Sequence, residues 1–392
     1  MLNTLLKVHL KRTKRLLAGH LWIFSNELLE SPKNYPPGAV VELYDMKETF
    51  LGVGYINPRS LIAVRLLARE RRPIDRELIE DRIKDALALR DRLTEERSGR
   101  RLIYSEADYL PGLIADSYEH CLVLQFLTAG MDALKEPVIE ILDRMTEPEV
   151  IVLRNDSRSR TLEGLPLEKK IVKGDLHTFP VISEGGLFFE VDPYEGQKTG
   201  FFLDQRENRR CLGEMIKGGR GLDLFCYSGA WSLRCASAGA HVTAVDASEK
   251  ALSLGGKNAE RNGLQEQVTF IKEDVFPFLR RELDAGERRY DFIVCDPPAF
   301  VKSGEKLREG VRAYGELNGL CMKLLKRGGI LVTSSCSYHL GKEMFIDMLR
   351  MAARRSGRGV RLLEFRSQGR DHPVLLSMPE TEYLKCAFLL ID

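Results

Sequence analysis

The chain has 392 residues, which is too long for one ordinary hydrophobic core, so we expect two or three domains. Its 59 lysines and arginines nearly balance its 57 acidic residues, and a net charge of +2 does not by itself predict nucleic-acid binding. The eight cysteines lack paired spacing and no apolar run approaches a membrane-spanning length, which argues against a secreted disulfide protein and a membrane protein. We therefore expect a cytoplasmic protein with no secretory signal and no membrane association.

Positive charge is concentrated near the N-terminus. Over residues 1–35, six basic residues face only two acidic ones. The basic residues are Lys7, Lys11, Arg12, Lys14, Arg15 and Lys33. Together with His9, His20 and Trp22, they form either an RNA-facing patch or an ordinary solvated surface.

A β-rich module follows this basic segment. Three runs rich in β-branched and aromatic residues, separated by turn residues, occupy 39–44, 50–55 and 61–67. They predict a small barrel-like domain, and the change of composition at Pro73 places its end at residue 72. The first predicted domain is therefore 1–72.

Residues 73–185 are predicted to form a central α+β domain. Its predicted elements are helices over 74–97 and 131–145 and strands over 121–126 and 150–153. The loop over 154–160 offers three arginines that could pair with phosphate. Alternatively, it is an exposed loop in which Asp156 supplies the counter-charge.

The third predicted domain, 186–392, contains the string Gly221-Leu-Asp-Leu-Phe-Cys-Tyr-Ser-Gly-Ala-Trp-Ser232. It predicts an apolar strand, a turn and a helix that begins near Ser228 or Gly229. A glycine there lets a ligand approach the backbone, and the helix N-terminus offers unpaired N–H groups. The glycines at 219 and 221 precede the strand, which disfavours NAD. The ligand contacts expected from this string are Asp223, Phe225, Tyr227, Ser228 and Gly229.

Three further strands lead to carboxylates. They are predicted over 241–246, 268–272 and 290–295. Asp246 could accept hydrogen bonds from a ribose diol or, like Ser248, cap the next helix. Asp274 could bind an adenine amine or be an ordinary loop acid. Asp296 is followed by two prolines, which hold its backbone rigid at a strand end.

Alternating strands and helices, including a helix over 305–326 and a strand over 328–336, predict an α/β fold with a doubly wound parallel sheet. Strands over 360–365 and 383–390 would close this sheet. Ligands of such folds bind at the carboxyl ends of the strands. If the fourth and fifth strands are neighbours, spaced at roughly 4.8 Å, Asp296 and Cys336 lie side by side. The site then combines S-adenosylmethionine with a candidate covalent nucleophile.

A thiol beside a carboxylate suits methylation of a pyrimidine at carbon 5. That carbon is a weak nucleophile until a thiolate adds at carbon 6. Cys336 would be the thiolate, and since a free cysteine has a pKa of about 8.5, its surroundings must favour ionisation. Asp296 would hold the cytosine amine or ring nitrogen. The alternative for Cys336 is a small buried residue in an apolar strand.

The other cysteines are interpreted as structural. Cys295 precedes the Asp-Pro-Pro turn, but strand alternation directs it away from the side that Asp296 faces, so we expect it in the core. The remaining six have neither a paired spacing nor a histidine at metal-ligand spacing, and we expect no metal.

Motifs along nearly the whole chain resemble the bacterial large-subunit (23S) rRNA cytosine-C5 methyltransferases, which join a PUA domain, a small central domain and a class I (Rossmann-like) methyltransferase domain. The resemblance is carried by His20–Phe24, Asp108–Leu113, Gly196–Arg206, Cys226–Gly229, Asp296–Phe300, Ser335–Ser337, Asp371–Pro373 and Tyr383–Lys385. The string GQKTGFFLDQR at 196–206 is the most specific of these. One departure is Ala299, where family members often have lysine.

The resemblance implies a role for each matching residue. The residues that border the cofactor and base pocket would be Phe202, Asp204, Gln205 and Arg206. Asp246 would bind the cofactor ribose, Asp274 would lie near the adenine, Asp296 would contact both cofactor and target base, and Cys336 would attack the base.

These observations predict an enzyme that methylates carbon 5 of a cytosine in 23S rRNA with S-adenosyl-L-methionine. The expected partner is large-subunit rRNA or its assembly intermediate, and a homodimer is compatible with the sequence. Two alternatives stay open. One is an rRNA adenine or guanine amino-group methyltransferase, which needs no cysteine; the other is a catalytically inactive ribosome assembly factor.

Overall fold

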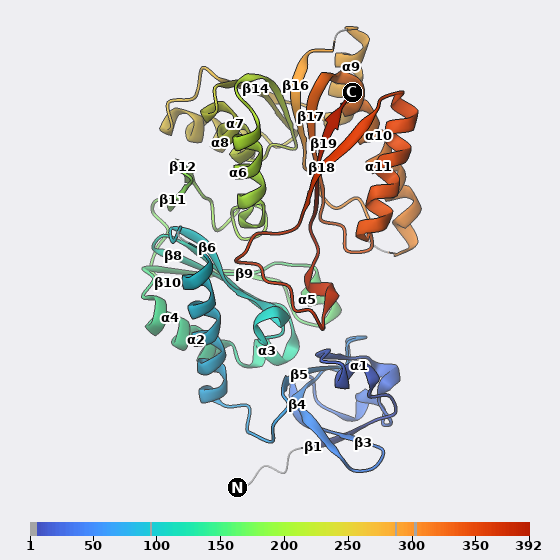
Figure 1. Ribbon diagram of the computed structural model, residues 1–392. Coiled ribbons are helices and arrows are strands. Elements are labelled where there is room, and N and C mark those ends of the chain that lie inside the picture. Colours follow the sequence, from blue (N-terminus) through green and yellow to red (C-terminus); the bar gives the residue numbers. More distant parts are fainter. Residues whose placement is uncertain (1–5, 95, 287, 302–303) are drawn as a thin grey trace. The chain divides into compact units, whose positions relative to one another are not determined.

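The computed structural model describes residues 6–94, 96–286, 288–301 and 304–392, which form two compact units (Figure 1). Unit 1 comprises Met1–Ile182, Val191–Leu203 and Arg370–Thr381. Unit 2 comprises Ser183–Glu190, Asp204–Gly369 and Glu382–Asp392. Each unit is therefore assembled from segments that are far apart in the sequence. The predicted division into three domains stays a prediction.

The N-terminal part of unit 1 is a five-stranded sheet in the order β1-β3-β4-β5-β2. Its strands are β1 (Leu6–Leu10), β2 (Trp22–Ile23), β3 (Ala39–Asp45), β4 (Phe50–Ile56) and β5 (Val64–Ala68), and the short helix α1 (Lys14–Leu17) follows β1. Alternate residues such as Val41 and Leu43 are fully buried, because successive side chains of a strand point to opposite faces. The predicted β-rich module is confirmed, although β5 begins at Val64 and not at Leu61.

A second five-stranded sheet in unit 1 has the order β10-β9-β8-β7-β6. Its strands are β6 (Gly99–Tyr104), β7 (Leu113–Tyr118), β8 (Cys121–Phe126), β9 (Val150–Asn155) and β10 (Glu168–Lys173). The helices are α2 (Arg76–Leu93), α3 (Ala129–Ala133), α4 (Lys135–Thr146) and α5 (Ser159–Leu162). Asp75 caps α2 by accepting a hydrogen bond from the Leu78 backbone N–H. The single helix predicted over 131–145 is in fact preceded by α3 and begins at Lys135.

Two buried arginines tie distant segments of unit 1 together. Arg90 is completely buried, pairs with both carboxylate oxygens of Asp108 and donates to the backbone oxygen of Asp371. Arg101 forms a two-pronged pair with Asp116, at 2.8 and 2.7 Å. Because Asp371 is remote in sequence, the first cluster anchors the segment Arg370–Thr381 within unit 1.

Two of the three arginines in the loop over 154–160 of unit 1 are not available to phosphate. Arg154 is 5% exposed and bonds to Asp156 and to the Pro193 carbonyl, whereas Arg160 is 1% exposed and bonds to backbone oxygens and to Asp132. Both guanidinium groups are therefore used inside the protein. Asp156 supplies the counter-charge of Arg154, as the alternative interpretation expected. Arg158 is exposed, and its pairing with phosphate stays a prediction.

Unit 2 contains a seven-stranded sheet in the order β15-β14-β13-β16-β17-β19-β18. Its strands are β13 (Gly219–Leu224), β14 (Ala240–Asp246), β15 (Val268–Lys272), β16 (Tyr290–Cys295), β17 (Leu325–Ser335), β18 (Val360–Arg366) and β19 (Lys385–Ile391). All pairings from β15 to β17 are parallel, and β19 runs antiparallel to both of its neighbours. The predicted sheet is thus confirmed, but β19 is reversed, and β17 begins at Leu325 although residues 325 and 326 were predicted to end the preceding helix.

Helices cover both faces of this sheet. They are α6 (Arg206–Met215), α7 (Ala230–Ser237), α8 (Glu249–Arg261), α9 (Val275–Asp284), α10 (Leu307–Leu324) and α11 (Lys342–Ser356). Figure 1 shows α6, α7 and α8 on one side of the strands and α10 and α11 on the other. The short strands β11 (Val181–Glu184) and β12 (Leu187–Glu190) precede this fold.

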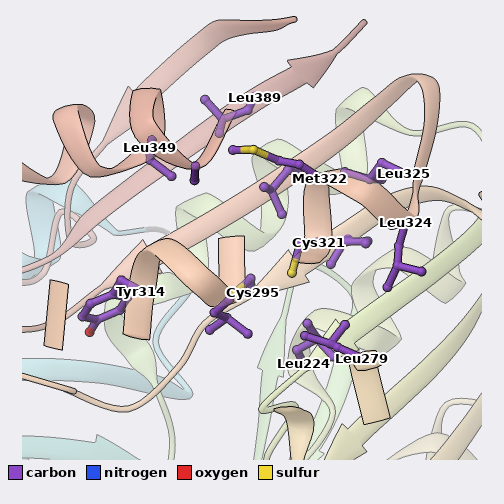
Figure 2. Close-up of a cluster of buried hydrophobic side chains, with 14 of the residues drawn as sticks. Leu224, Leu279, Cys295, Tyr314, Cys321, Met322, Leu324, Leu325, Leu349 and Leu389 are labelled. Carbon is purple, nitrogen blue, oxygen red and sulfur yellow. The ribbon is translucent and has the colours of Figure 1, made fainter. Parts of the chain in front are cut away.

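The main core of unit 2 lies where α9, α10 and α11 pack against the sheet (Figure 2). Cys295 and Cys321 lie within it, beside side chains such as Leu279 and Met322, and both cysteines are fully buried. Burial raises the pKa of the Cys295 thiol far above its ordinary value. The prediction that Cys295 is a core residue is confirmed.

Replacing Arg90 with methionine should strongly destabilise unit 1, because Asp108 would remain as a buried charge without its partner. We expect a loss of about 3–5 kcal/mol, the usual cost of breaking a buried ion pair. The measurement is urea unfolding followed by tryptophan fluorescence, since Trp22 reports on unit 1 and Trp231 on unit 2. Arg92→Met is the matched control, because Arg92 is an exposed residue of the same helix. Equal stability of the two variants would contradict a stabilising role for the Arg90 cluster.

Candidate active site

The loop between β13 and α7 has an unusual backbone. Phe225, Tyr227 and Gly229 all have positive φ angles, of 62°, 50° and 78°. A side chain at Gly229 would also meet the Phe270 ring at 3.1 Å, so glycine is required there for both reasons. Such conformations in residues other than glycine cost free energy and gather at ligand sites. Helix α7 begins directly after Gly229, as the sequence predicted.

Asp223 lies inside β13 below this loop and is 1% exposed. One carboxylate oxygen accepts hydrogen bonds from the backbone and hydroxyl of Ser232, at 3.0 and 2.6 Å. Within the described ranges, its other oxygen and the buried Ser228 hydroxyl have no hydrogen-bond partner. Burial, together with the charges of Asp296 and Asp246, raises the pKa of Asp223 to about 7. Three carboxylates therefore converge at this edge of the sheet.

Asp246 links two loops of the site. Its two oxygens accept hydrogen bonds from the backbone N–H groups of Tyr227 at 3.0 Å and Ser248 at 2.8 Å. Ser248, not Asp246, caps helix α8. A carboxylate has about four acceptor positions, so Asp246 keeps capacity for a hydroxyl ligand.

Asp274 caps helix α9 by accepting a hydrogen bond from the Phe276 backbone at 2.9 Å. Beside it, Phe300 contacts the rings of Phe225 and Phe276, each with a centroid distance of 6.4 Å. An aromatic surface is thus built from three elements around the carboxyl ends of β13 and β16. Flat apolar ligands such as adenine suit a surface of this kind.

Asp296 follows β16, and its carboxylate accepts hydrogen bonds from Gln205 and Trp231. The Gln205 side-chain amide donates to one carboxylate oxygen at 3.0 Å, and the Trp231 indole N–H donates to the same oxygen at 3.2 Å. Gln205 also donates to the Ser334 hydroxyl at 3.1 Å. These bonds fix the orientation of the carboxylate and connect it with β17.

Strands β16 and β17 are neighbours, as predicted, and Cys295 pairs with Thr333. This register places Asp296 level with Ser334, so Cys336 follows two residues further along the neighbouring strand. All eight cysteines belong to the described residues; seven are buried, and Cys336 is partly exposed. The strand pairing therefore brings an accessible thiol and a carboxylate to the same edge of the sheet.

Hydrogen bonds from three segments hold Ser337, the residue after Cys336. The Ser337 hydroxyl accepts from the Val301 backbone N–H at 3.2 Å and bonds to the buried Tyr314 hydroxyl at 3.0 Å. Lys385 donates to the Ser337 carbonyl at 2.8 Å. Val301 in the segment after the Asp-Pro-Pro turn, Tyr314 in α10 and Lys385 in β19 thus all hold the turn that carries Cys336.

The other residues predicted to border the pocket are Asp204, Arg206 and Phe202. Asp204 is buried and accepts a hydrogen bond from the Tyr383 hydroxyl at 2.5 Å. Arg206 forms an ion pair with the buried Glu184 at 3.7 Å. Phe202 lies in unit 1, where the Lys198 ammonium sits 4.6 Å from its ring centre. Their assignment to the cofactor stays a prediction.

Sequence reasoning did not assign roles to Trp231, Ser334, Tyr314 or Lys385. Trp231 and Lys385 lie within the motifs 221–232 and 383–385, and this position could have marked them as candidate site residues. Nothing in the sequence distinguished Ser334 and Tyr314 from ordinary strand and helix residues.

Comparison with known proteins agrees with this geometry. A family model described as S-adenosylmethionine-dependent methyltransferase matches residues 152–366, more than half of the chain, and a PUA-like domain model matches residues 6–69. The chain belongs to the S-adenosylmethionine-dependent methyltransferase family. It has an N-terminal PUA-like domain, as its predicted β module suggested.

Relatives cover nearly the full length of this methyltransferase. The protein named ribosomal RNA large subunit methyltransferase I of Shewanella amazonensis is 37% identical over 380 residues, covering 95% of this chain and 96% of the relative. Its namesake from Photobacterium profundum is also 37% identical, over 382 residues. A solved structure of SMU.776 complexed with SAH has a TM-score of 0.85 and 19% identity, covering 98% of this chain and 99% of that one. At this identity, the likeness shows the fold.

The site residues fit S-adenosylmethionine. This ligand carries a sulfonium and an ammonium group, and the three carboxylates favour positive charge. Asp246 suits its ribose, the aromatic surface suits its adenine, and the vacant acceptor of Asp223 suits a hydrogen-bond donor. The described part of the chain contains no helix that is long and apolar enough to span a membrane.

The affinity for S-adenosylmethionine should depend on the ionisation of Asp223. Because its pKa is about 7, the carboxyl is mostly protonated at pH 6, and cation binding must then expel a proton. We expect affinity to fall up to about tenfold between pH 8 and pH 6. Calorimetry in buffers of different ionisation enthalpy would measure both the affinity and the released proton.

Asp223→Asn should bind more weakly and lose this part of the pH dependence. Asp347→Asn, which removes an exposed carboxylate on α11, is the matched control. If Asp223→Asn kept the full pH dependence, the titrating group would be elsewhere, for instance on the ligand.

Proposed function

We propose that this protein transfers a methyl group to carbon 5 of a cytosine in large-subunit ribosomal RNA through a covalent adduct with Cys336. The observation that carries the proposal is the accessible Cys336 thiol at the carboxyl end of β17, beside the strand that presents Asp296. The names of the relatives support the large-subunit ribosomal RNA as substrate. The PUA-like domain supports RNA binding.

Each residue has a defined task in this reaction. The Cys336 thiolate adds to carbon 6 of the cytosine, and electron density moves to carbon 5, which then accepts the methyl group. S-adenosylmethionine supplies that methyl group when bound. Asp296, held by Gln205 and Trp231, binds the cytosine amine or ring nitrogen and keeps the ring oriented. Loss of the carbon 5 proton to a base and cleavage of the carbon–sulfur bond restore the ring and the thiolate.

The decisive experiment replaces Cys336 with alanine. Unmodified large-subunit rRNA is incubated with S-adenosylmethionine and each protein, and its nucleosides are analysed by mass spectrometry. The wild type should form 5-methylcytidine, and Cys336→Ala should be slower by at least about a thousandfold with nearly unchanged cofactor affinity, because it lacks the nucleophile.

Cys295→Ala is the matched control, since it removes a thiol that lies next to Asp296 but in the core. It should remain active. A methylated purine, or product from Cys336→Ala at the wild-type rate, would instead indicate direct transfer to an amino group.

The basic N-terminal segment is proposed to contact the RNA backbone. In the structure, Lys7 pairs with Glu48 and Arg15 with Glu380. Lys11, Arg12 and Lys14 are exposed and form no ion pair with any described residue. Three unpaired cations around α1 provide a compact site for phosphates.

Replacing Lys11, Arg12 and Lys14 together by alanine should weaken RNA binding and its dependence on salt. Three lost contacts would reduce the slope of log affinity against log salt by about 2 on single-stranded RNA. The measurement is fluorescence anisotropy with an rRNA fragment at several salt concentrations. The control replaces Arg350, Arg354 and Arg355 on α11, which removes the same charge from another surface. Equal slopes in the two triple variants would refute the RNA contact.

A further inference from the structure

Lys385 is a buried cation next to the turn that carries the proposed nucleophile. It begins β19 and pairs directly with Ser335, the residue before Cys336. Only 6% of its surface is exposed. Its ammonium group donates to the carbonyls of Ser337 at 2.8 Å and Tyr383 at 2.7 Å. Lys385 therefore lies beneath the turn and close to both sides of Cys336.

The charge of Lys385 is not neutralised by an ion pair. No carboxylate among the described residues lies within ion-pair distance of its ammonium group, and two of the three ammonium protons are used by carbonyls. Removing an ammonium group from water without a counter-ion is costly. The two carbonyl groups replace only part of the hydration that the ammonium group loses on burial.

Four ionisable groups of the described residues bear on this cation and on the thiol beside it. Lys385 interacts electrostatically with Cys336 and with Glu382 of its own segment, and the neutral Tyr314 hydroxyl of α10 lies near the same thiol. Asp296 lies at the end of the neighbouring strand β16, where its negative charge opposes ionisation of the thiol. A thiolate at Cys336 would provide the negative charge that Lys385 lacks.

We propose that Lys385 is a positioning residue that stabilises the thiolate form of Cys336 and holds the turn that presents it. The inference rests on the proposed function, because it explains how a thiol beside a carboxylate becomes a nucleophile at neutral pH. On ionisation, the thiol proton passes to solvent and Lys385 keeps its own proton. Since the ammonium group already binds the Ser337 carbonyl, it needs no rearrangement to act.

The ionisation of Lys385 is compatible with this role. Burial lowers its pKa to about 8, and the neighbouring Cys336 and Glu382 favour the charged form. The group is therefore mostly protonated at pH 7. Above pH 8 the cation is lost, and with it the stabilisation of the thiolate.

The test measures the reactivity of Cys336 in the full-length protein without RNA or methyl donor. Iodoacetamide alkylation is followed at a series of pH values, and the Cys336 peptide is quantified by mass spectrometry, with Cys336→Ser as the blank. In the wild type, half-maximal reactivity should occur at least one pH unit below the value of about 8.5 for a free cysteine. Half-maximal reactivity at or above that value would overturn the inference without any Lys385 variant.

Lys385→Met keeps the side-chain volume and removes the charge. It should move the half-maximal pH upward by about one unit, which slows alkylation at pH 7 about tenfold. Lys385→Arg should recover most of the rate, whereas Lys323→Met, an exposed lysine on α10, should not change it. Thermal melting shows whether each variant folds. If Lys385→Met does not fold, the pH of half-maximal alkylation in the wild type decides whether the inference holds.

An unchanged pH profile in folded Lys385→Met would show that the lysine only stabilises the turn. The assay does not depend on RNA methylation. If the reactivity of Cys336 depends on Lys385 but the protein makes no 5-methylcytidine, the inference about the thiol is confirmed. Only the reaction proposed for that thiol is then rejected.

Discussion

Parallel pairing of β13, β16 and β17 is the constraint on which the site depends. Three residues far apart in sequence, Asp223, Asp296 and Cys336, reach one edge of one sheet because these strands run in the same direction. The antiparallel β19 adds Lys385 at the same edge, since a reversed strand begins where its neighbour ends. A fully parallel sheet would place the first residue of this strand at the opposite edge.

The two ends of the site differ in charge. At β13 and β14, burial and the nearby carboxylates of Asp296 and Asp246 raise the pKa of Asp223, and the three carboxylates favour a cationic ligand. At β17 and β19, a buried ammonium group favours an anion. Asp296 lies between the two regions, where hydrogen bonds from Gln205 and Trp231 orient its carboxylate. A methyl donor with a positive charge and a thiolate with a negative charge therefore suit different ends of one site.

Local sequence patterns predicted much of unit 2 because its strands are apolar and bounded by turns. The strands at 268–272 and 290–295 were predicted with the bounds that the structure has, and the alternation that sent Cys295 to the core is confirmed. The same reasoning missed β6, β7 and β10 in unit 1. Their sequences include charged residues such as Arg101 and Asp116, which are buried only because each meets the other across the sheet. Propensity cannot reveal a partner that tertiary structure supplies.

The same limit explains why the chemistry of Lys385 was not visible in the sequence. A lysine at the start of a strand ordinarily extends into water, and only the register between β17 and β19 shows that this one turns inward. Covalent attack needs a thiolate, and a thiolate needs a nearby positive charge. In the covalent reaction proposed above, the buried ammonium group would stabilise that thiolate.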